Sequence, residues 1–159
     1  MSHRTFPFVP KSSVKLEPGD FWAIPVDGGL FACGRVIDFW PKDYKGSKTG
    51  FLAGLMDWSS EQPPSVESIA GVQTIQQGGA HYKSIILTGG EILGNRSLEL
   101  DGISPQTFIE YPDNKTAYIY SGLKPIRPAK PEEVKKYPTV SIFGYLYLKE
   151  RANYLFGKK

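Results

Sequence analysis

Hydrophobic and polar positions are most clearly patterned between residues 19 and 40, where the chain reads GDFWAIPVDGGLFACGRVIDFW. Two strands are predicted there, at 20–26 and 30–40, because both runs are rich in aromatic and branched side chains. Between them, Asp27-Gly28-Gly29 predicts a tight hairpin. Asp-Gly accepts the positive φ angles of a primed turn, and the second glycine allows a bulge.

The second strand of this hairpin is apolar on both of its faces. Alternation places on one face Phe31, Cys33, Ile37 and Phe39, and on the other Leu30, Ala32, Val36 and Trp40. A strand with one face in water usually alternates between polar and apolar residues. We therefore expect the hairpin to be central in its sheet, or to have its outer face covered by a helix or a partner.

Further strands are predicted along the rest of the chain, joined by loops. They span 51–58, 82–87, 91–93 and 115–122. The polar stretch 41–50 is predicted to be a loop, and one helical turn is predicted around 66–70. Near the end of the chain, a C-terminal helix is predicted in spite of Gly144, because one helical face would collect Val140, Phe143, Tyr147, Tyr154 and Leu155.

These elements together predict a mainly β, α+β fold, with an antiparallel, partly barrel-like sheet and a C-terminal helix. The chain has 159 residues, of which 40% are hydrophobic and 22% charged, so we expect one globular domain spanning 1–159. Its 17 glycines and 13 prolines are scattered, which is typical of many short elements joined by turns. Residues 1–15 are polar with two prolines and are predicted to be a loose lead-in.

The charge pattern argues against a polyanionic partner. Nineteen basic and 16 acidic residues give a net charge of +3, and the basic residues of 124–136 are interleaved with prolines and glutamates. We interpret that segment as a solvated connection, because nucleic-acid surfaces need clustered Lys and Arg. No apolar run approaches the roughly 18 residues of a membrane span, and the start lacks the apolar core of a secretory signal. We therefore expect a cytoplasmic protein without membrane contact.

Candidate catalytic and metal-binding residues are few. The KGSKTG stretch fails as a P-loop, because Ser47 interrupts the required Gly-Lys-Ser/Thr order. Cys33, the only cysteine, lies in a strand expected to be buried, where a thiol behaves as a small apolar group. The histidines are His3 and His81, and a Cys33–His81 pair stays open at this stage. Without a three-ligand set, we expect no metal, no cofactor and no enzyme activity.

Arg35 and the aromatic residues are the most informative single positions. Arg35 falls on the Cys33 face of its strand, so it needs a carboxylate partner, or it opens to solvent, a ligand or another protein. Tryptophans are usually core residues, but Trp, Tyr and Arg are also enriched among binding hot spots. An aromatic patch is therefore possible among Trp22, Trp40, Trp58, Tyr44 and Tyr111.

The stretch LEPGDFWAIPVDGGLFACGRVIDF resembles the opening of the bacterial Immunity protein 26 family. In that family Gly-Asp, an aromatic pair, Ala-Ile-Pro, an acidic-Gly turn and Gly-Arg-Val follow one another. The matching positions here are Gly19, Asp20, Phe21, Ala23, Ile24, Pro25, Asp27, Gly28, Gly34, Arg35 and Val36. The later HYKSIILTGGEILGNRSL, residues 81–98, is similar to the family's second block.

This resemblance implies a non-catalytic immunity protein that binds and neutralises a cognate polymorphic toxin domain in the cytoplasm. We expect its partner surface on the first hairpin and the 41–50 loop, formed by Asp20, Trp22, Arg35, Asp38, Trp40, Tyr44 and Trp58. Small SH3-like barrels also open with Gly-Asp and Gly-Arg-Val, so a small-ligand or nucleic-acid-binding barrel is the second hypothesis. An enzyme that uses Cys33 or carboxylates is the third. No oligomeric state is inferred from the sequence.

Overall fold

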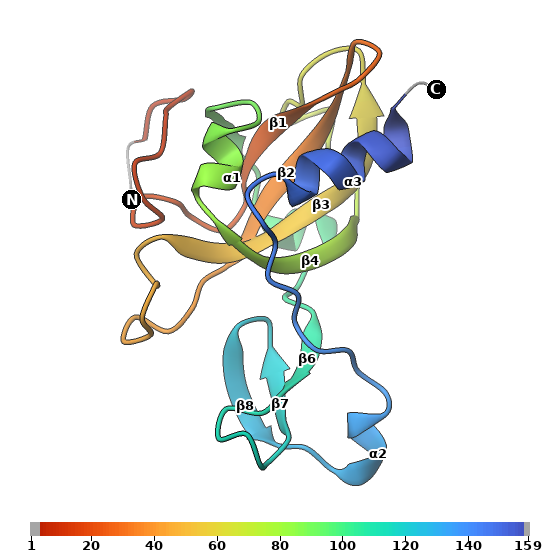
Figure 1. Ribbon diagram of the computed structural model, residues 1–159. Helices are drawn as coiled ribbons and strands as arrows, with labels where there is room; N and C mark the ends of the chain where they lie inside the picture. Colours follow the sequence, from red (N-terminus) through yellow and green to blue (C-terminus); the bar gives the residue numbers. More distant parts are fainter. Residues whose placement is uncertain (1–3, 158–159) are drawn as a thin grey trace.

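A computed structural model describes residues 4–157 and contains two antiparallel sheets (Figure 1). The larger sheet has five strands in the order β4-β3-β2-β1-β5. Their bounds are β1 Asp20–Val26, β2 Leu30–Asp38, β3 Gly50–Ser60, β4 Thr74–His81 and β5 Ile92–Asn95. The β1–β2 hairpin is therefore internal to the sheet, as its two-sided apolar pattern predicts.

The smaller sheet has the order β6-β7-β8 and lies below the larger one in Figure 1. Its strands are β6 Thr107–Glu110, β7 Tyr118–Ser121 and β8 Lys124–Pro128. The helical segments are α1 Lys83–Ile86, the 3-10 helix η1 Leu98–Asp101, α2 Pro131–Val134 and α3 Tyr147–Phe156. The mainly β, α+β class and the C-terminal helix are confirmed, although the helix begins only after Gly144.

No sheet within residues 4–157 is closed into a barrel. The edge strands β4 and β5 do not pair with each other, so the five-stranded sheet stays open. Each edge is instead covered by a single bridge from an irregular segment, Gly79 to Ile142 on β4 and Ile92 to Phe8 on β5. Each bridge occupies part of the row of backbone groups that an open edge would otherwise offer to another strand.

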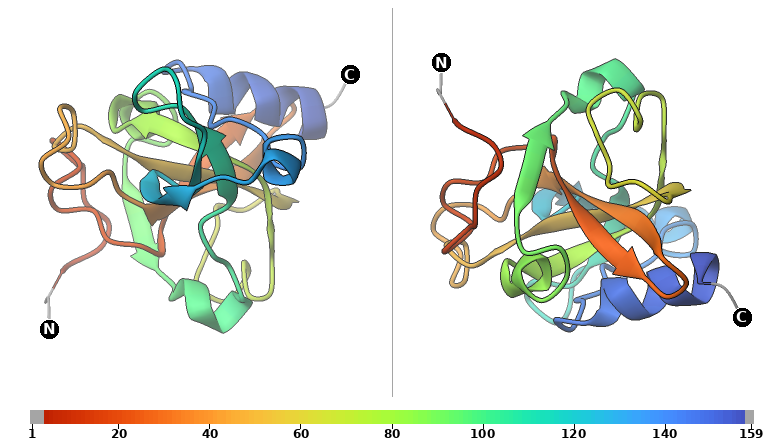
Figure 2. Two further views of the ribbon diagram at one scale, coloured as in Figure 1. Left: turned by 90° about the horizontal axis from the view of Figure 1, so that it is seen from below. Right: turned by 90° about the horizontal axis from the view of Figure 1, so that it is seen from above.

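Two hydrophobic cores lie on the two faces of the five-stranded sheet. In the first core, α3 packs on β1, β2 and β3 (Figure 2), and its Leu148 and Ala152 are fully buried. The second core joins Cys33 and Ile37 of β2 to Phe108 of β6. The smaller sheet therefore packs against the larger one through a shared apolar layer.

Alternation along β2 does not continue to Trp40 as predicted. The β2–β3 register shifts between Val36 and Asp38, so two residues of β2 lie opposite one of β3. Such a bulge exchanges the faces of the residues that follow it. Phe39 consequently packs on the first core and Trp40 on the second, the reverse of the predicted assignment.

The described part of the predicted loose lead-in, residues 4–15, is tied to the folded body. The Arg4 guanidinium bonds both carboxylate oxygens of Asp20, at 2.7 and 2.6 Å. Backbone groups of Phe8 exchange two hydrogen bonds with Ile92, and the N–H of Ser13 donates to the carbonyl of Lys48. Among the described residues, no helix is both long and apolar enough to cross a membrane.

Candidate functional site

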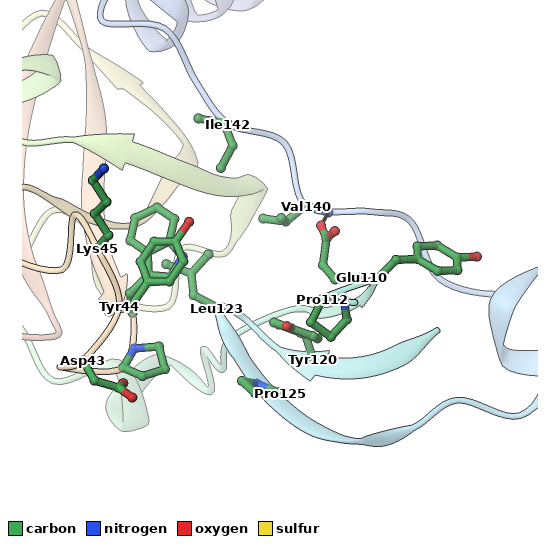
Figure 3. Close-up of a pocket in the computed structure, with 13 residues that line it drawn as sticks. Asp43, Tyr44, Lys45, Glu110, Pro112, Tyr120, Leu123, Pro125, Val140 and Ile142 are labelled. Carbon is green, nitrogen blue, oxygen red and sulfur yellow. Dashed lines mark hydrogen bonds between the residues drawn. The ribbon is translucent and has the colours of Figure 1, made fainter. Parts of the chain in front are cut away.

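An open groove of about 720 Å³ lies between the loop that follows β2 and the smaller sheet (Figure 3). Three segments distant in sequence meet there: the 40–45 loop, the smaller sheet, and the chain that leads to α3. The lining side chains are mostly aromatic residues, prolines and aliphatics, namely Trp40, Pro41, Asp43, Tyr44, Lys45, Glu110, Tyr111, Pro112, Tyr120, Leu123, Pro125, Val140 and Ile142.

One wall of the groove is a stack of two aromatic rings, which lies on a part of the larger sheet where glycines leave the backbone without side chains. Trp40 and Tyr44 are parallel, with ring centroids 5.4 Å apart and an interplanar angle of 8°. The indole of Trp40 lies against Gly50 of β3 and Gly79 of β4, where any Cβ would overlap it. Because these two positions lack side chains, Trp40 seats on the backbone and Tyr44 forms the outer layer, 52% exposed.

The loop that carries Tyr44 is held by hydrogen bonds. The N–H of Tyr44 donates to the carbonyl of Pro41, and the N–H of Ser47 donates to that of Tyr44. The Ser47 hydroxyl donates to the carbonyl of Lys42, and the buried Ser13 hydroxyl donates to that of Ser47. Although residues 41–49 form no helix or strand, their hydrogen bonds hold the outer ring in place.

The opposite wall is formed by the smaller sheet. Glu110, the last residue of β6, accepts a 2.8 Å hydrogen bond from the N–H of Val140. Burial raises the pKa of the Tyr120 phenol, and the nearby Glu110 carboxylate and the Tyr44 and Tyr118 phenols raise it further. Groups from both walls, the Glu110 carboxylate and the Tyr44 phenol, therefore act on the pKa of Tyr120.

The structure brings together two of the seven predicted partner-binding residues, Trp40 and Tyr44, whereas Asp38 is not among the lining residues of the groove. The Asp38 carboxylate forms a 3.2 Å ion pair with the ammonium of Lys124, which links the end of β2 to the start of β8. Trp58, further along β3, is partly buried against the second core. Of the expected partner surface, the 41–50 loop with Tyr44 is therefore the part that is accessible.

The other three predicted residues are interior and do not reach the surface. Asp20, Trp22 and Arg35 have no exposed area. Asp20 is enclosed by Arg4, by the side-chain amide of Asn95 and by the N–H of Glu17. The indole N–H of Trp22 donates to the hydroxyl of Thr88 at 3.1 Å, and its ring meets Phe51 edge-on. The prediction that these three residues belong to a partner surface is therefore wrong, because their side chains are part of the interior.

Arg35 has the carboxylate partner that its position requires. Its Nη1 donates to Oδ2 of Asp101 at 2.9 Å, and both side chains are fully buried. Asp101 also accepts bonds from the Arg96 guanidinium and from the N–H of Gly71. Burial alone would raise the pKa of Asp101, but these bonds from Arg96, Gly71 and Arg35 outweigh it and leave the pKa at about 2.

The open possibility of a Cys33–His81 pair is excluded by strand register. His81 lies opposite Gly50 of β3, whereas Cys33 lies beyond Leu55 on that strand. At least five residues of extended strand, about 16 Å, separate the two. Burial raises the pKa of the Cys33 thiol to about 12 despite the nearby Arg35. Within residues 4–157, no three His, Cys, Asp or Glu side chains are grouped to hold a metal ion.

Sequence reasoning missed seven of the groove's lining residues, among them Glu110, Tyr120 and Val140. The 115–122 stretch is predicted correctly to contain a strand, and its alternating tyrosines were a usable signal for an aromatic face. Nothing local indicates that Glu110 and Val140 meet, because their contact joins segments 30 residues apart. Tyr111, which the sequence suggested as a patch member, does line the groove.

No family model matches this chain, and no curated protein or solved structure matches it either. The Immunity protein 26 resemblance therefore rests on residues 16–39 and 81–98 alone.

Proposed function

We propose that the protein is a non-catalytic immunity protein that binds a bacterial toxin domain in the cytoplasm and neutralises it. The partner surface is the groove, with Tyr44 as the central anchor. The observation that carries this proposal is the Trp40–Tyr44 stack, a large aromatic surface half exposed at the mouth of a groove. Aromatic residues in such pockets supply a disproportionate share of binding energy in protein interfaces.

The rigidity of this anchor also supports a binding role. The Trp40 ring is seated on Gly50 and Gly79, and the hydrogen bonds of the 41–50 loop fix Tyr44 above it. Ordering a mobile side chain or loop costs free energy when a complex forms. A ring that is already held in place avoids most of that cost, which favours tight and specific binding.

A second candidate is a small-ligand site in the same groove, and the groove volume favours it. About 720 Å³ falls within the 300–1,000 Å³ range of small-molecule sites, and aromatic walls are common there. Nucleic acid fits this groove less well, because Asp43 and Glu110 place two carboxylates among its lining residues, where phosphates would be repelled.

The test asks first whether the gene directly upstream encodes a large secreted protein with a variable C-terminal domain, and then co-expresses that domain with this chain. Wild-type protein should restore growth and form a stable complex with that domain. The Tyr44→Ala variant should bind at least ten-fold more weakly, the loss expected for an aromatic hot spot. Tyr154→Ala is the matched control, since Tyr154 is 70% exposed on α3 and is not a lining residue of the groove.

Each failure has a distinct meaning. If the wild-type protein neither binds the toxin domain nor restores growth, the immunity function is wrong and the small-ligand site becomes the leading hypothesis. If it binds but Tyr44→Ala and Tyr154→Ala behave alike, the partner surface lies elsewhere on the molecule.

A further inference from the structure

We infer that the groove receives an arginine side chain from an extended segment of the partner, with the guanidinium held between the Tyr44 ring and the Glu110 carboxylate. This inference rests on the proposed function, since it names the chemistry by which the same groove would recognise its partner. It follows from an uncompensated carboxylate, from the tyrosine rings of the two walls, and from the kind of backbone that lines the groove.

Glu110 is a charged group without a cationic partner. No Lys or Arg within residues 4–157 forms an ion pair with it, whereas Asp38 at the end of β2 is paired with Lys124. Its bond from the Val140 N–H orients the carboxylate but leaves its charge unneutralised. A partly buried carboxylate of this kind gains more from an incoming cation than a fully solvated one, because water screens the attraction less.

Tyrosine rings lie on both walls of the groove. Figure 3 shows Tyr44 on the loop wall, with Glu110 and Tyr120 on the sheet wall. Ring faces attract a cation within about 6 Å of the centroid, most strongly where water is partly excluded. Two tyrosine rings and a carboxylate therefore offer complementary contacts to one positive group.

The remaining charges of the groove do not supply this cation from within the chain. Lys45 is the one basic side chain among the lining residues, and in Figure 3 it extends along the loop wall rather than towards Glu110. Asp43 adds a second carboxylate at the same wall. The lining residues thus carry two negative charges and one positive charge, which favours a basic side chain over an acidic one.

The backbone of the groove favours recognition of a side chain rather than of an anion. Pro41, Pro112 and Pro125 line it and have no N–H to donate. Arginine suits this lining better than lysine, because its planar guanidinium can stack on a ring and still bond a carboxylate. The flat apolar surfaces of the prolines suit the methylene stem of the same side chain.

The experiment titrates the full protein with acetyl-Gly-Pro-Arg-Pro-Gly-amide and with the same peptide carrying citrulline, the neutral isostere of arginine. The readouts are the NMR shifts of the Val140 amide and the Trp40 indole N–H. The arginine peptide should give saturable shifts at both groups, and the citrulline peptide should bind at least five-fold more weakly. The Glu110→Gln variant should bind the arginine peptide as weakly as wild type binds citrulline.

Glu110→Gln is a mild change, because a glutamine carbonyl oxygen still accepts the bond from the Val140 N–H. The matched control is Glu61→Gln, which removes an equal charge from an exposed position outside the groove and should leave binding unchanged. Equal binding of the two peptides, or the absence of saturable shifts at Val140 and Trp40, would overturn the inference. Tighter binding of an oligonucleotide than of the arginine peptide would overturn it as well.

The outcomes separate this inference from the proposed function. If the toxin domain binds while the arginine peptide does not, the arginine pocket is wrong and the immunity function stands. If the arginine peptide binds while no toxin domain does, the pocket stands and its partner belongs to another class.

Discussion

At the scale of single residues, the buried ion pair between Arg35 of β2 and Asp101 of η1 places the strictest requirement on its surroundings. The side chains of Arg35 and Asp101 are both fully buried, and a lone charge at either position would be strongly unfavourable. Arg35, Arg96 and the N–H of Gly71 all donate hydrogen bonds to the Asp101 carboxylate, so neither charge is left alone. That carboxylate thereby ties β2, η1 and the loop before β4 together.

Acid should weaken the protein through Asp101. Its pKa is lowered from 3.8 to about 2 in the folded state, so the unfolded chain takes up its proton first as the pH falls. Its contribution to the free energy of unfolding is therefore complete above about pH 4 and is lost between about pH 4 and pH 2. We expect urea unfolding measured at pH 5, 3.5 and 2.5 to show this loss.

Glu133, whose pKa is also lowered to about 2, chiefly by a hydrogen bond from Arg127, would add to the same slope, so the series is run in a Glu133→Gln background. A direct check is the ¹³C titration of the Asp101 carboxyl group in the folded protein. A midpoint near its ordinary value of 3.8 would contradict the network. The sequence predicts that Arg35 needs a carboxylate, but it does not identify a partner 66 positions away.

At the scale of elements, the larger sheet depends on glycines that leave room for rings. Gly34 of β2 lies directly opposite Trp22 of β1, and a Cβ there would come within 2.7 Å of the indole Cη2. The ring is fully buried and held by its bond to Thr88, so it has little freedom to move. The close pairing of the hairpin therefore requires glycine at this position.

Gly34→Ala should destabilise the protein by roughly 1–3 kcal/mol, the usual cost of overpacking a core. The measurement is chemical denaturation followed by tryptophan fluorescence. Gly144→Ala is the matched control: no atom lies within 4 Å of its added Cβ, so its effect should be close to zero or slightly stabilising. Equal stability of the two variants would show that the sheet accommodates the extra methyl group.

Glycine also explains where element prediction fails. The β1–β2 hairpin is predictable because its turn and its apolar runs are local signals. The sequence analysis did not predict β4, because residues 74–81, TIQQGGAH, have little apolar pattern of their own. It placed a strand at 82–87 instead, where the structure has the helix α1. Gly78 and Gly79 of β4 are filled by rings from elsewhere, Phe143 and Trp40. β8 was missed because Pro125 and Pro128 are tolerated only on an edge strand, which 124–128 proves to be.

At the scale of the whole molecule, the groove exists because two sheets share one core. Phe108 of β6 and Leu123, just before β8, are buried with Ile37 and Leu52 of the larger sheet. One wall of the groove, Trp40 and Tyr44, was predictable from the aromatic residues of a local loop. The wall with Glu110 and Tyr120 was not, since it depends on how the second sheet packs, and no local pattern encodes that.

This shared core predicts that both sheets unfold together. Phe108→Ala should lower the free energy of unfolding by about 3–5 kcal/mol, the usual cost of removing a buried phenylalanine. Urea unfolding followed by far-UV circular dichroism and by tryptophan fluorescence should give one coincident transition in wild type and variant. Ile126→Ala is the control, because Ile126 is 59% exposed on β8 and its loss should matter little.

Two separate transitions, with only one of them shifted by Phe108→Ala, would show that the smaller sheet folds on its own. The walls of the groove would then be free to move apart, and Tyr44 and Glu110 would not be held at a fixed separation. Coincident transitions would instead mean that any partner entering the groove binds walls already set by the core. Phe108→Ala removes part of the core that sets the walls. Compared at equal fractions of folded protein, the variant should therefore bind the arginine peptide more weakly than wild type.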